Sequence, residues 1–173
     1  VYLCCGLMPW QYFSAVVLRG AAIMVDNGNI IKKVYFPREI LPISSVTAGL
    51  INFLISCIII VIFVLLGGVG LSWHLIFLPL LAVIQYIFTL ALVFLISSIN
   101  VYVRDVEYIV VFILNMLFYA TPVLYSYEMF EGTKLIWLFR LNPMAHLINA
   151  YRDIFYVHQI PQLMNLLVVK SLL

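Results

Sequence analysis

Charged residues are scarce in this sequence of 173 residues: Asp, Glu, Lys and Arg together make up 9% of it, whereas 66% of the residues are apolar. A soluble domain carries about a quarter charged residues and roughly half apolar ones. The composition therefore excludes a soluble enzyme, a disordered segment and a nucleic-acid-binding module. The formal net charge of +2 is too small to attract a polyanion. These deficits indicate an integral membrane protein.

Residue patterns that bind metals or phosphates are also missing. The cysteines Cys4, Cys5 and Cys57 lie in apolar runs and have no Cys or His partner at ligand spacing, which favours buried packing over a disulfide or a metal site. The 3 histidines are dispersed, and none has a partner at i+4. No phosphate-binding loop of the form G-x-x-x-x-G-K is present. We therefore expect no catalytic residue, no metal site and no cofactor bound by this chain.

Long apolar runs are what the sequence contains in abundance. From Ile40 to Val103 no Asp, Glu, Lys or Arg occurs, and a helix crosses the hydrocarbon layer with about 20 residues. This stretch therefore fits two helices and a short hairpin. The runs are continuously apolar, whereas transmembrane β-strands alternate apolar and polar positions. The predicted fold class is thus all-α, a single truncated transmembrane domain over residues 1–173 with spans at 1–25, 43–66, 75–98, 108–125 and, incomplete, 162–173.

Basic residues predict the orientation of these spans. Two lysines and Arg38 lie in the connection 26–42, and Arg104 lies in the connection 99–107, whereas the hairpin between the second and third spans has no Lys or Arg. Connections rich in Lys and Arg remain in the cytoplasm. The connections 26–42 and 99–107 are therefore predicted to be cytoplasmic, and the hairpin is predicted to be external.

The fourth connection, residues 126–161, is external by alternation and is not a simple loop. Its central part, Leu135–Val157, is amphipathic, and Pro143 and Pro161 would each interrupt a helix. We predict two short helices broken near Asn142-Pro143. They either dip into the outer leaflet, where non-helical backbone survives only against protein or water, or lie on the membrane surface as interfacial helices.

In three of the predicted spans, side chains of one kind recur every three or four residues, so each set shares one helical face. In the second and third spans these side chains are polar or small. In membranes such faces contact neighbouring helices, because small residues allow close approach and polar residues hydrogen-bond. The stripe of the fourth span is aromatic instead. It either lines a conduit for sugar rings or lipid chains or belongs to the core. The stripes are Ser45, Gly49, Asn52 and Ser56; Gln85 and Thr89; and Tyr108, Phe112, Asn115 and Tyr119.

The connection 26–42 is more apolar than orientation alone requires. Ile30, Ile31 and Val34 share one helical face, and Pro37 then ends the helix. A short helix that carries apolar and basic residues is suited to a groove on a partner protein. The alternative is that its apolar face lies against the membrane surface.

The segment Asn29–Pro42 (NIIKKVYFPREILP) resembles the signature of the type-2 ABC exporter permeases, in particular the branch that exports O-antigen, capsule and teichoic-acid polysaccharides. Further pieces of the same pattern follow in order and extend the resemblance over nearly the whole chain. These pieces are Gly6–Trp10 (GLMPW), Asn100–Val106 (NVYVRDV), Thr121–Tyr125 (TPVLY), Leu141–Met144 (LNPM) and Tyr151-Arg152.

The resemblance implies a homodimeric, multi-pass permease of the bacterial inner (plasma) membrane, with six spans per copy and the substrate path between the copies. This chain would hold about five of the six spans, together with short external re-entrant helices. The substrate would be a lipid-linked polysaccharide. Two copies of a separate ABC ATPase subunit would bind ATP and magnesium and supply the energy, so this chain would not be an enzyme.

The resemblance also implies roles for individual residues. A coupling helix that docks on the ATPase falls in the connection 26–42, and an external gate falls in the segment 126–161. The expected coupling residues are Asn29, Ile30, Ile31, Lys32, Lys33, Val34, Tyr35, Phe36 and Arg38. The expected path residues are Tyr108, Phe112, Asn115 and Tyr119, and the expected gate residues are Pro122, Tyr125, Asn142, Pro143 and Arg152.

Two other functions remain open at this point. An exporter of drugs or lipids would share the architecture and differ only in its cargo. A membrane-embedded glycan-processing enzyme would need an acid, a histidine or an arginine at membrane depth. The second to fourth spans offer none, and only Arg140 and Arg152 of the external segment are candidates.

Overall fold

The computed structural model describes residues 2–28, 37–66, 76–103, 105–121 and 142–154. All regular structure in these ranges is helical, which confirms the all-α fold class. The helices are α1 (Tyr2–Asp26), α3 (Ile40–Leu66), α4 (Leu78–Tyr102), α5 (Val106–Ala120) and α7 (Pro143–Arg152).

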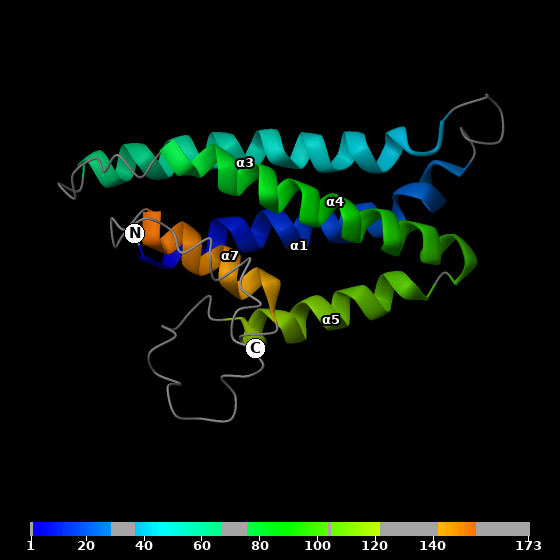
Figure 1. Cartoon of the computed structure of the whole chain (residues 1–173). Coiled ribbons are helices and arrows are strands. Elements are labelled where there is room, and N and C mark those ends of the chain that lie inside the picture. The colour runs from blue at the N-terminus through cyan, green and yellow to red at the C-terminus, as the bar shows by residue number, and fades with distance from the viewer. Residues whose placement is uncertain (1, 29–36, 67–75, 104, 122–141, 155–173) are drawn as a thin grey trace, which may run out of the picture.

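The four longer helices run alongside one another and alternate in direction (Figure 1). The end of α1, the start of α3, the end of α4 and the start of α5 therefore gather at one end of the bundle. The two connections predicted to be cytoplasmic join helices at this end, as the predicted orientation requires. The short helix α7 lies toward the opposite end, beside the first half of α1.

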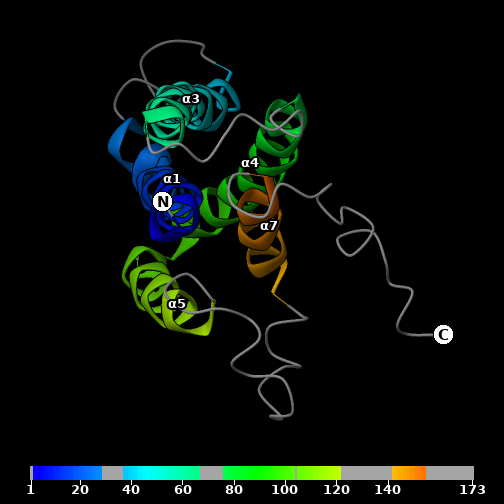
Figure 2. The ribbon, with the colours of Figure 1, turned by 90° about the vertical axis from the view of Figure 1, so that its left-hand side faces the viewer.

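Helix α1 occupies the centre of the bundle and contacts each of the other four helices. Figure 2 shows α1 between α3 and α5, with α4 and α7 toward one side. By length and composition α3 and α4 qualify as membrane spans, and only 28% and 33% of their most apolar windows are buried inside the chain. Helix α1 has a similar length and is less apolar. Other helices of the chain cover much of its surface.

The ends of the helices follow from the sequence. Helix α5 has 15 residues and ends at Ala120, earlier than the predicted end of the fourth span at residue 125. Thr121 then takes an extended backbone conformation, with φ −107° and ψ 134°. Proline Cδ disfavours the helical conformation in the residue that precedes it, and residue 122 is a proline. The helix therefore stops before the apolar run does.

Two buried amides join α1 to α4 at both ends of their contact. The Gln85 side chain donates to the Pro9 carbonyl at 2.8 Å, and the Asn100 side chain donates to the Ala21 carbonyl at 2.8 Å. Gln85 and Thr89 are completely buried. The predicted role of the Gln85 and Thr89 stripe in helix–helix contact is therefore confirmed.

Two substitutions of Gln85 should show how much stability depends on its hydrogen bond and how much a buried charge costs. We expect Gln85→Leu to lower the free energy of unfolding by about 1 kcal/mol, the usual net contribution of one hydrogen bond. Gln85→Glu should cost several kcal/mol more, since a carboxylate at this position is buried without a cation. Thermal unfolding of the purified protein in mild detergent would measure both shifts. A glutamate variant as stable as the parent would contradict the burial of this side chain.

Candidate functional site

The end of α5 and the start of α7 are tied together by one asparagine. Asn142 is the N-cap of α7, and its Oδ1 accepts a hydrogen bond from the Met144 backbone N–H at 3.0 Å. Its Nδ2 donates to Thr121 Oγ1 at 2.8 Å, and the Thr121 hydroxyl donates to the Leu117 carbonyl at 2.6 Å. Pro143 occupies the first turn of α7, where its missing N–H costs nothing. We call Asn142, Thr121 and Leu117 the α5–α7 clamp.

Helix α7 is packed into protein rather than spread on a surface. Seven of its residues are buried, and the helix contacts both α1 and α4. The Tyr151 ring is fully buried and meets the ring of Phe53 on α3 edge-on, at 5.7 Å between centroids. The buried residues are Met144, Ala145, Leu147, Ile148, Ala150, Tyr151 and Arg152. This part of the segment 126–161 is thus packed against other helices of the chain, whereas its depth in the membrane stays a prediction.

Arg152 lies at the C-terminal end of α7 and is only 4% exposed. A cation is favoured there by the partial negative charge of the last carbonyls of a helix. Arg152 also lies within electrostatic range of the Cys5 thiol on α1. The next residue, Asp153, is half-buried, and burial raises the pKa of its carboxyl above the ordinary value. The sequence marked Arg152 as a gate candidate but carried no signal that it would be buried.

The aromatic stripe of α5 faces away from the rest of the chain. Tyr108, Phe112 and Tyr119 are 76%, 63% and 73% exposed, and Asn115 is exposed with them. The opposite side of α5 is buried through Val110 and Leu114. The described residues leave this stripe uncovered, so both interpretations of it, a conduit lining and a core face, stay predictions.

Most of the predicted coupling residues lie outside the described residues, namely Asn29–Phe36, and so do the gate candidates Pro122 and Tyr125. Arg38 is described, and it is exposed in a turn closed by the Ile40 N–H and the Pro37 carbonyl at 3.2 Å. This turn leads directly into α3 at the end of the bundle where α1 ends. In the chain the segment 29–36 follows α1 and precedes this turn and α3.

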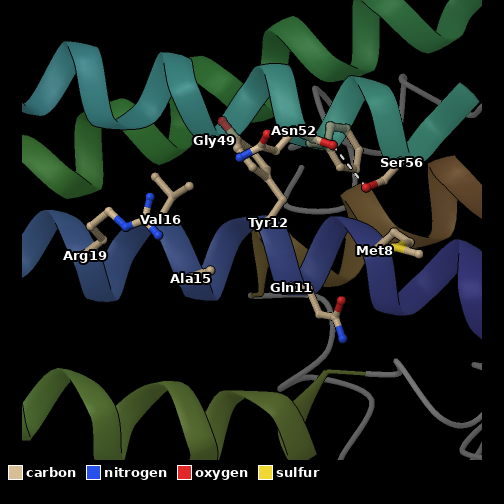
Figure 3. Close-up of a pocket in the computed structure, with 10 residues that line it drawn as sticks. Met8, Gln11, Tyr12, Ala15, Val16, Arg19, Gly49, Asn52 and Ser56 are labelled. Atoms are coloured by element: carbon tan, nitrogen blue, oxygen red, sulfur yellow. Dashed lines mark hydrogen bonds between the residues drawn. The ribbon is translucent and has the colours of Figure 1, made fainter.

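A groove lined by both apolar and polar residues lies between α1 and α3, on a face of the bundle that no other described helix covers (Figure 3). It has a volume of about 200 Å³ and is lined by residues of both helices. Helix α1 contributes Met8, Gln11, Tyr12, Ala15, Val16 and Arg19, and α3 contributes Gly49, Asn52, Phe53 and Ser56. The α3 stripe was visible in the sequence, but its combination with Gln11 and Arg19 was not.

Among the residues that the structure describes, no group of three or more His, Cys, Asp or Glu side chains is placed to hold a metal ion. The described polar groups form helix contacts, a cap and a groove. The fold and the apolar surfaces of α3 and α4 define a membrane-embedded helical domain.

The chain matches the model of the family described as ABC-2 type transporter over residues 1–156, and it belongs to this family. It is 39% identical over 158 residues to the O-antigen export system permease protein RfbA of Myxococcus xanthus. Two proteins of that name from Klebsiella pneumoniae are 36% identical over 157 residues and 34% identical over 157 residues. Each match covers 90% of this chain, and the chain spans 60% of the length of each relative.

Proposed function

We propose that this chain is part of the permease subunit of an ATP-driven exporter that moves lipid-linked polysaccharide across the bacterial inner membrane. The observation that carries the proposal is the match to the ABC-2 type transporter family over residues 1–156, with relatives at 34–39% identity that are named O-antigen export permeases. The apolar surfaces of α3 and α4 support membrane embedding. In this proposal the protein is multi-pass, and the connections 26–42 and 99–107 are cytoplasmic.

In this mechanism the energy enters through the connection 26–42. A separate ABC ATPase subunit, in two copies, binds ATP and magnesium and docks on the residues from Asn29 to Phe36 and on Arg38. Its movement displaces the end of α1 and the start of α3, which flank this connection. Because α1 contacts all the other described helices, a rigid displacement of α1 is transmitted to the whole bundle.

The substrate path in this proposal lies between two copies of the permease, along the exposed face of α5. Tyr108, Phe112 and Tyr119 offer aromatic faces on which sugar rings stack, and Asn115 offers an amide for their hydroxyls. The two-copy arrangement is supported by the exposure of this face, since the described part of one chain leaves it uncovered.

The external gate in this proposal is α7 with its flanking residues. Asn142 is the N-cap of α7, and Pro143 and Arg152 are its first and last residues. The clamp joins this helix to the end of α5. Pro122 and Tyr125 follow the clamp in the chain. A movement of α5 would thus reach the gate through the Asn142–Thr121 hydrogen bond.

The coupling proposal is tested by a triple substitution, Ile30→Ala, Lys33→Ala and Tyr35→Ala, in the complete protein. We expect the variant to insert into the membrane normally, to lose co-purification with a Walker-type ATPase and to lose export. A matched control is the double variant Tyr102→Ala and Val103→Ala, two exposed residues on the other predicted cytoplasmic connection. Normal ATPase binding and export in the triple variant would contradict the assigned docking segment.

The cargo is tested separately, by display of polysaccharide at the cell surface in a strain that lacks the gene and in the complemented strain. We expect the lipid-linked polysaccharide to accumulate inside the deletion strain and to reach the surface again on complementation. An unchanged surface polysaccharide, together with an ATPase that still co-purifies, would favour the exporter of drugs or lipids over the polysaccharide exporter.

A further inference from the structure

A chain of aromatic ring contacts crosses the bundle from α4 through α1 to α5. The Phe88 ring on α4 stacks on the Phe13 ring of α1, with 5.8 Å between the ring centroids. Phe13 contacts Trp10 on the same helix at 5.8 Å, and Trp10 contacts Phe118 on α5 at 5.7 Å. Phe118 in turn meets Tyr119 edge-on at 5.5 Å. Each distance lies in the range of about 4.5–7 Å that aromatic pairs prefer.

Trp10 stands in the middle of this chain of contacts and is held in place by the rest of the bundle. Its side chain is only 5% exposed, and Phe13, one turn further along α1, is buried as well. The carbonyl of the preceding residue, Pro9, accepts a hydrogen bond from the buried Gln85 side chain of α4 at 2.8 Å. The Trp10 ring therefore belongs to a turn of α1 that is tied directly to α4, and it reaches from there to α5.

The last member of the chain, Tyr119, is exposed. It belongs to the final turn of α5, which ends at Ala120, and its side chain is 73% exposed. Phe118 beside it is half-buried and packs against the core. The start of α5 lies at the end of the bundle that is predicted to be cytoplasmic, so Tyr119 lies toward the opposite, predicted external end (Figure 1).

The other two aromatic residues of the α5 stripe lack this support. Tyr108 and Phe112 are 76% and 63% exposed, and within the described ranges neither of them makes a ring contact. A side chain presents a ligand with one defined surface only when its own rotamer is held by packing. Among the described residues of the stripe, Tyr119 is therefore the aromatic residue best suited to hold a ligand in one orientation.

We propose that Trp10 and Phe118 are positioning residues for Tyr119, and that they hold its ring in the orientation in which a sugar ring of the polysaccharide stacks on it. Phe118 acts on the Tyr119 ring directly, and Trp10 acts through Phe118. Because Trp10 belongs to α1, a displacement of α1 reaches Tyr119 through the same contacts. A sugar as the ligand rests on the proposed function, whereas the support of the Tyr119 ring can be measured without transport.

The test places a fluorinated tyrosine at position 119, or at position 108 as a control, in the complete protein purified in mild detergent. Fluorine NMR then reports the surroundings of each ring separately. Phe118→Leu and Trp10→Leu should both shift and broaden the signal from position 119. Trp10→Phe keeps a ring and should restore most of the parent signal. The signal from position 108, about 16 Å away along the axis of α5, should be unchanged in all three variants.

Phe53→Leu is the matched control for loss of a buried ring. Phe53 is 3% exposed and stacks on Tyr12, and neither ring belongs to the chain of contacts that leads to α5. We therefore expect Phe53→Leu to lower stability and to leave the signal from position 119 unchanged. Phe118 is only half-buried, so its variant keeps the measurement possible if Trp10→Leu does not fold.

Two results of the NMR measurement would overturn the proposal. An unchanged signal from position 119 in Phe118→Leu or in Trp10→Leu would show that these rings do not hold Tyr119. Equal changes at positions 119 and 108 would show a general loss of structure instead of a local support.

Surface polysaccharide in cells tests the ligand separately. Tyr119→Leu should lower it several-fold, and Phe118→Leu should lower it to a similar extent while the ATPase still co-purifies. Normal surface polysaccharide in Tyr119→Leu would overturn the role of this ring in sugar stacking, whatever the NMR signals show. Failure of the proposed function is thus distinguishable from failure of the positioning contacts, which the NMR signals alone decide.

Discussion

Replacement of Gly20 by leucine is expected to separate α1 from α4 and to lower the yield of folded protein sharply. A Cβ atom at Gly20 would lie 2.5 Å and 2.9 Å from the two Cγ atoms of Val93, and Val93 is completely buried. Overpacking of this kind typically costs about 1–3 kcal/mol. The effect should reach further, because the next residue, Ala21, accepts the Asn100 hydrogen bond, which a displaced α1 would lose. Thermal unfolding and size-exclusion profiles in mild detergent would measure the change.

Gly28 provides the matched control for this substitution. It stands just beyond the end of α1, and a Cβ atom there would meet nothing within 4 Å. Gly28→Leu should therefore leave the unfolding temperature almost unchanged. A second control is relief of the steric conflict: the double variant Gly20→Ala and Val93→Ala should be more stable than Gly20→Ala alone. Equal destabilisation by leucine at residues 20 and 28 would show that α1 and α4 do not approach closely at Gly20.

The second large effect is expected from Asn142→Ala, which removes the cap bond from the Met144 N–H and the hydrogen bond of the α5–α7 clamp to Thr121 Oγ1. Loss of the N-cap of α7 should cost about 0.5–2 kcal/mol, and loss of the hydrogen bond to Thr121 should cost about 0.5–1.5 kcal/mol. Asn142→Asp separates the two terms, because the carboxylate still accepts from the Met144 N–H but cannot donate to Thr121 Oγ1. We therefore expect the aspartate variant to be intermediate in stability between the alanine variant and the parent.

A double-mutant cycle with Thr121→Val measures the clamp itself. If the Asn142–Thr121 hydrogen bond exists, the effects of Asn142→Asp and Thr121→Val on the free energy of unfolding should be non-additive, since each removes the same bond. Surface polysaccharide measured in cells that carry the same variants would show whether the clamp connects α5 to the proposed gate. Strictly additive effects on stability would contradict the hydrogen bond.

Much of the helical architecture could be predicted from residue type and spacing. The continuously apolar runs predicted α3 and α4 to within a few residues, because burial of such runs in lipid leaves the backbone no partner but itself. Pro143 predicted a local break, and α7 begins there. The end of α5 was not predicted, because the fourth span was expected to run to residue 125 and the helix stops at Ala120. The spacing of Gln85 and Thr89 predicted their shared face and its contact with another helix.

The sites could be predicted only in part, because a stripe specifies a face but not what that face meets. The stripe of Ser45, Gly49, Asn52 and Ser56 was expected to contact a helix along its length. In the structure Ser45 is buried, whereas Asn52 is exposed at the edge of the groove. The aromatic stripe of α5 had two interpretations, and only the placement of Val110 and Leu114 against the bundle showed that it points outward.

By itself the sequence determined that this is a helical membrane protein, where its two most apolar helices lie, and that a helix begins at Pro143. These properties depend on transfer of apolar side chains out of water and on local backbone sterics, which act within one segment of the chain. Only the tertiary structure decided that α1 is central, that α7 and Arg152 are buried, and that the α1–α3 groove and the α5 stripe face outward. These properties depend on contacts between residues far apart in the chain, such as Gln85 with Pro9 and Asn142 with Thr121. They could not be predicted because the spacing of residues within one helix specifies a face of that helix but not the element that the face contacts.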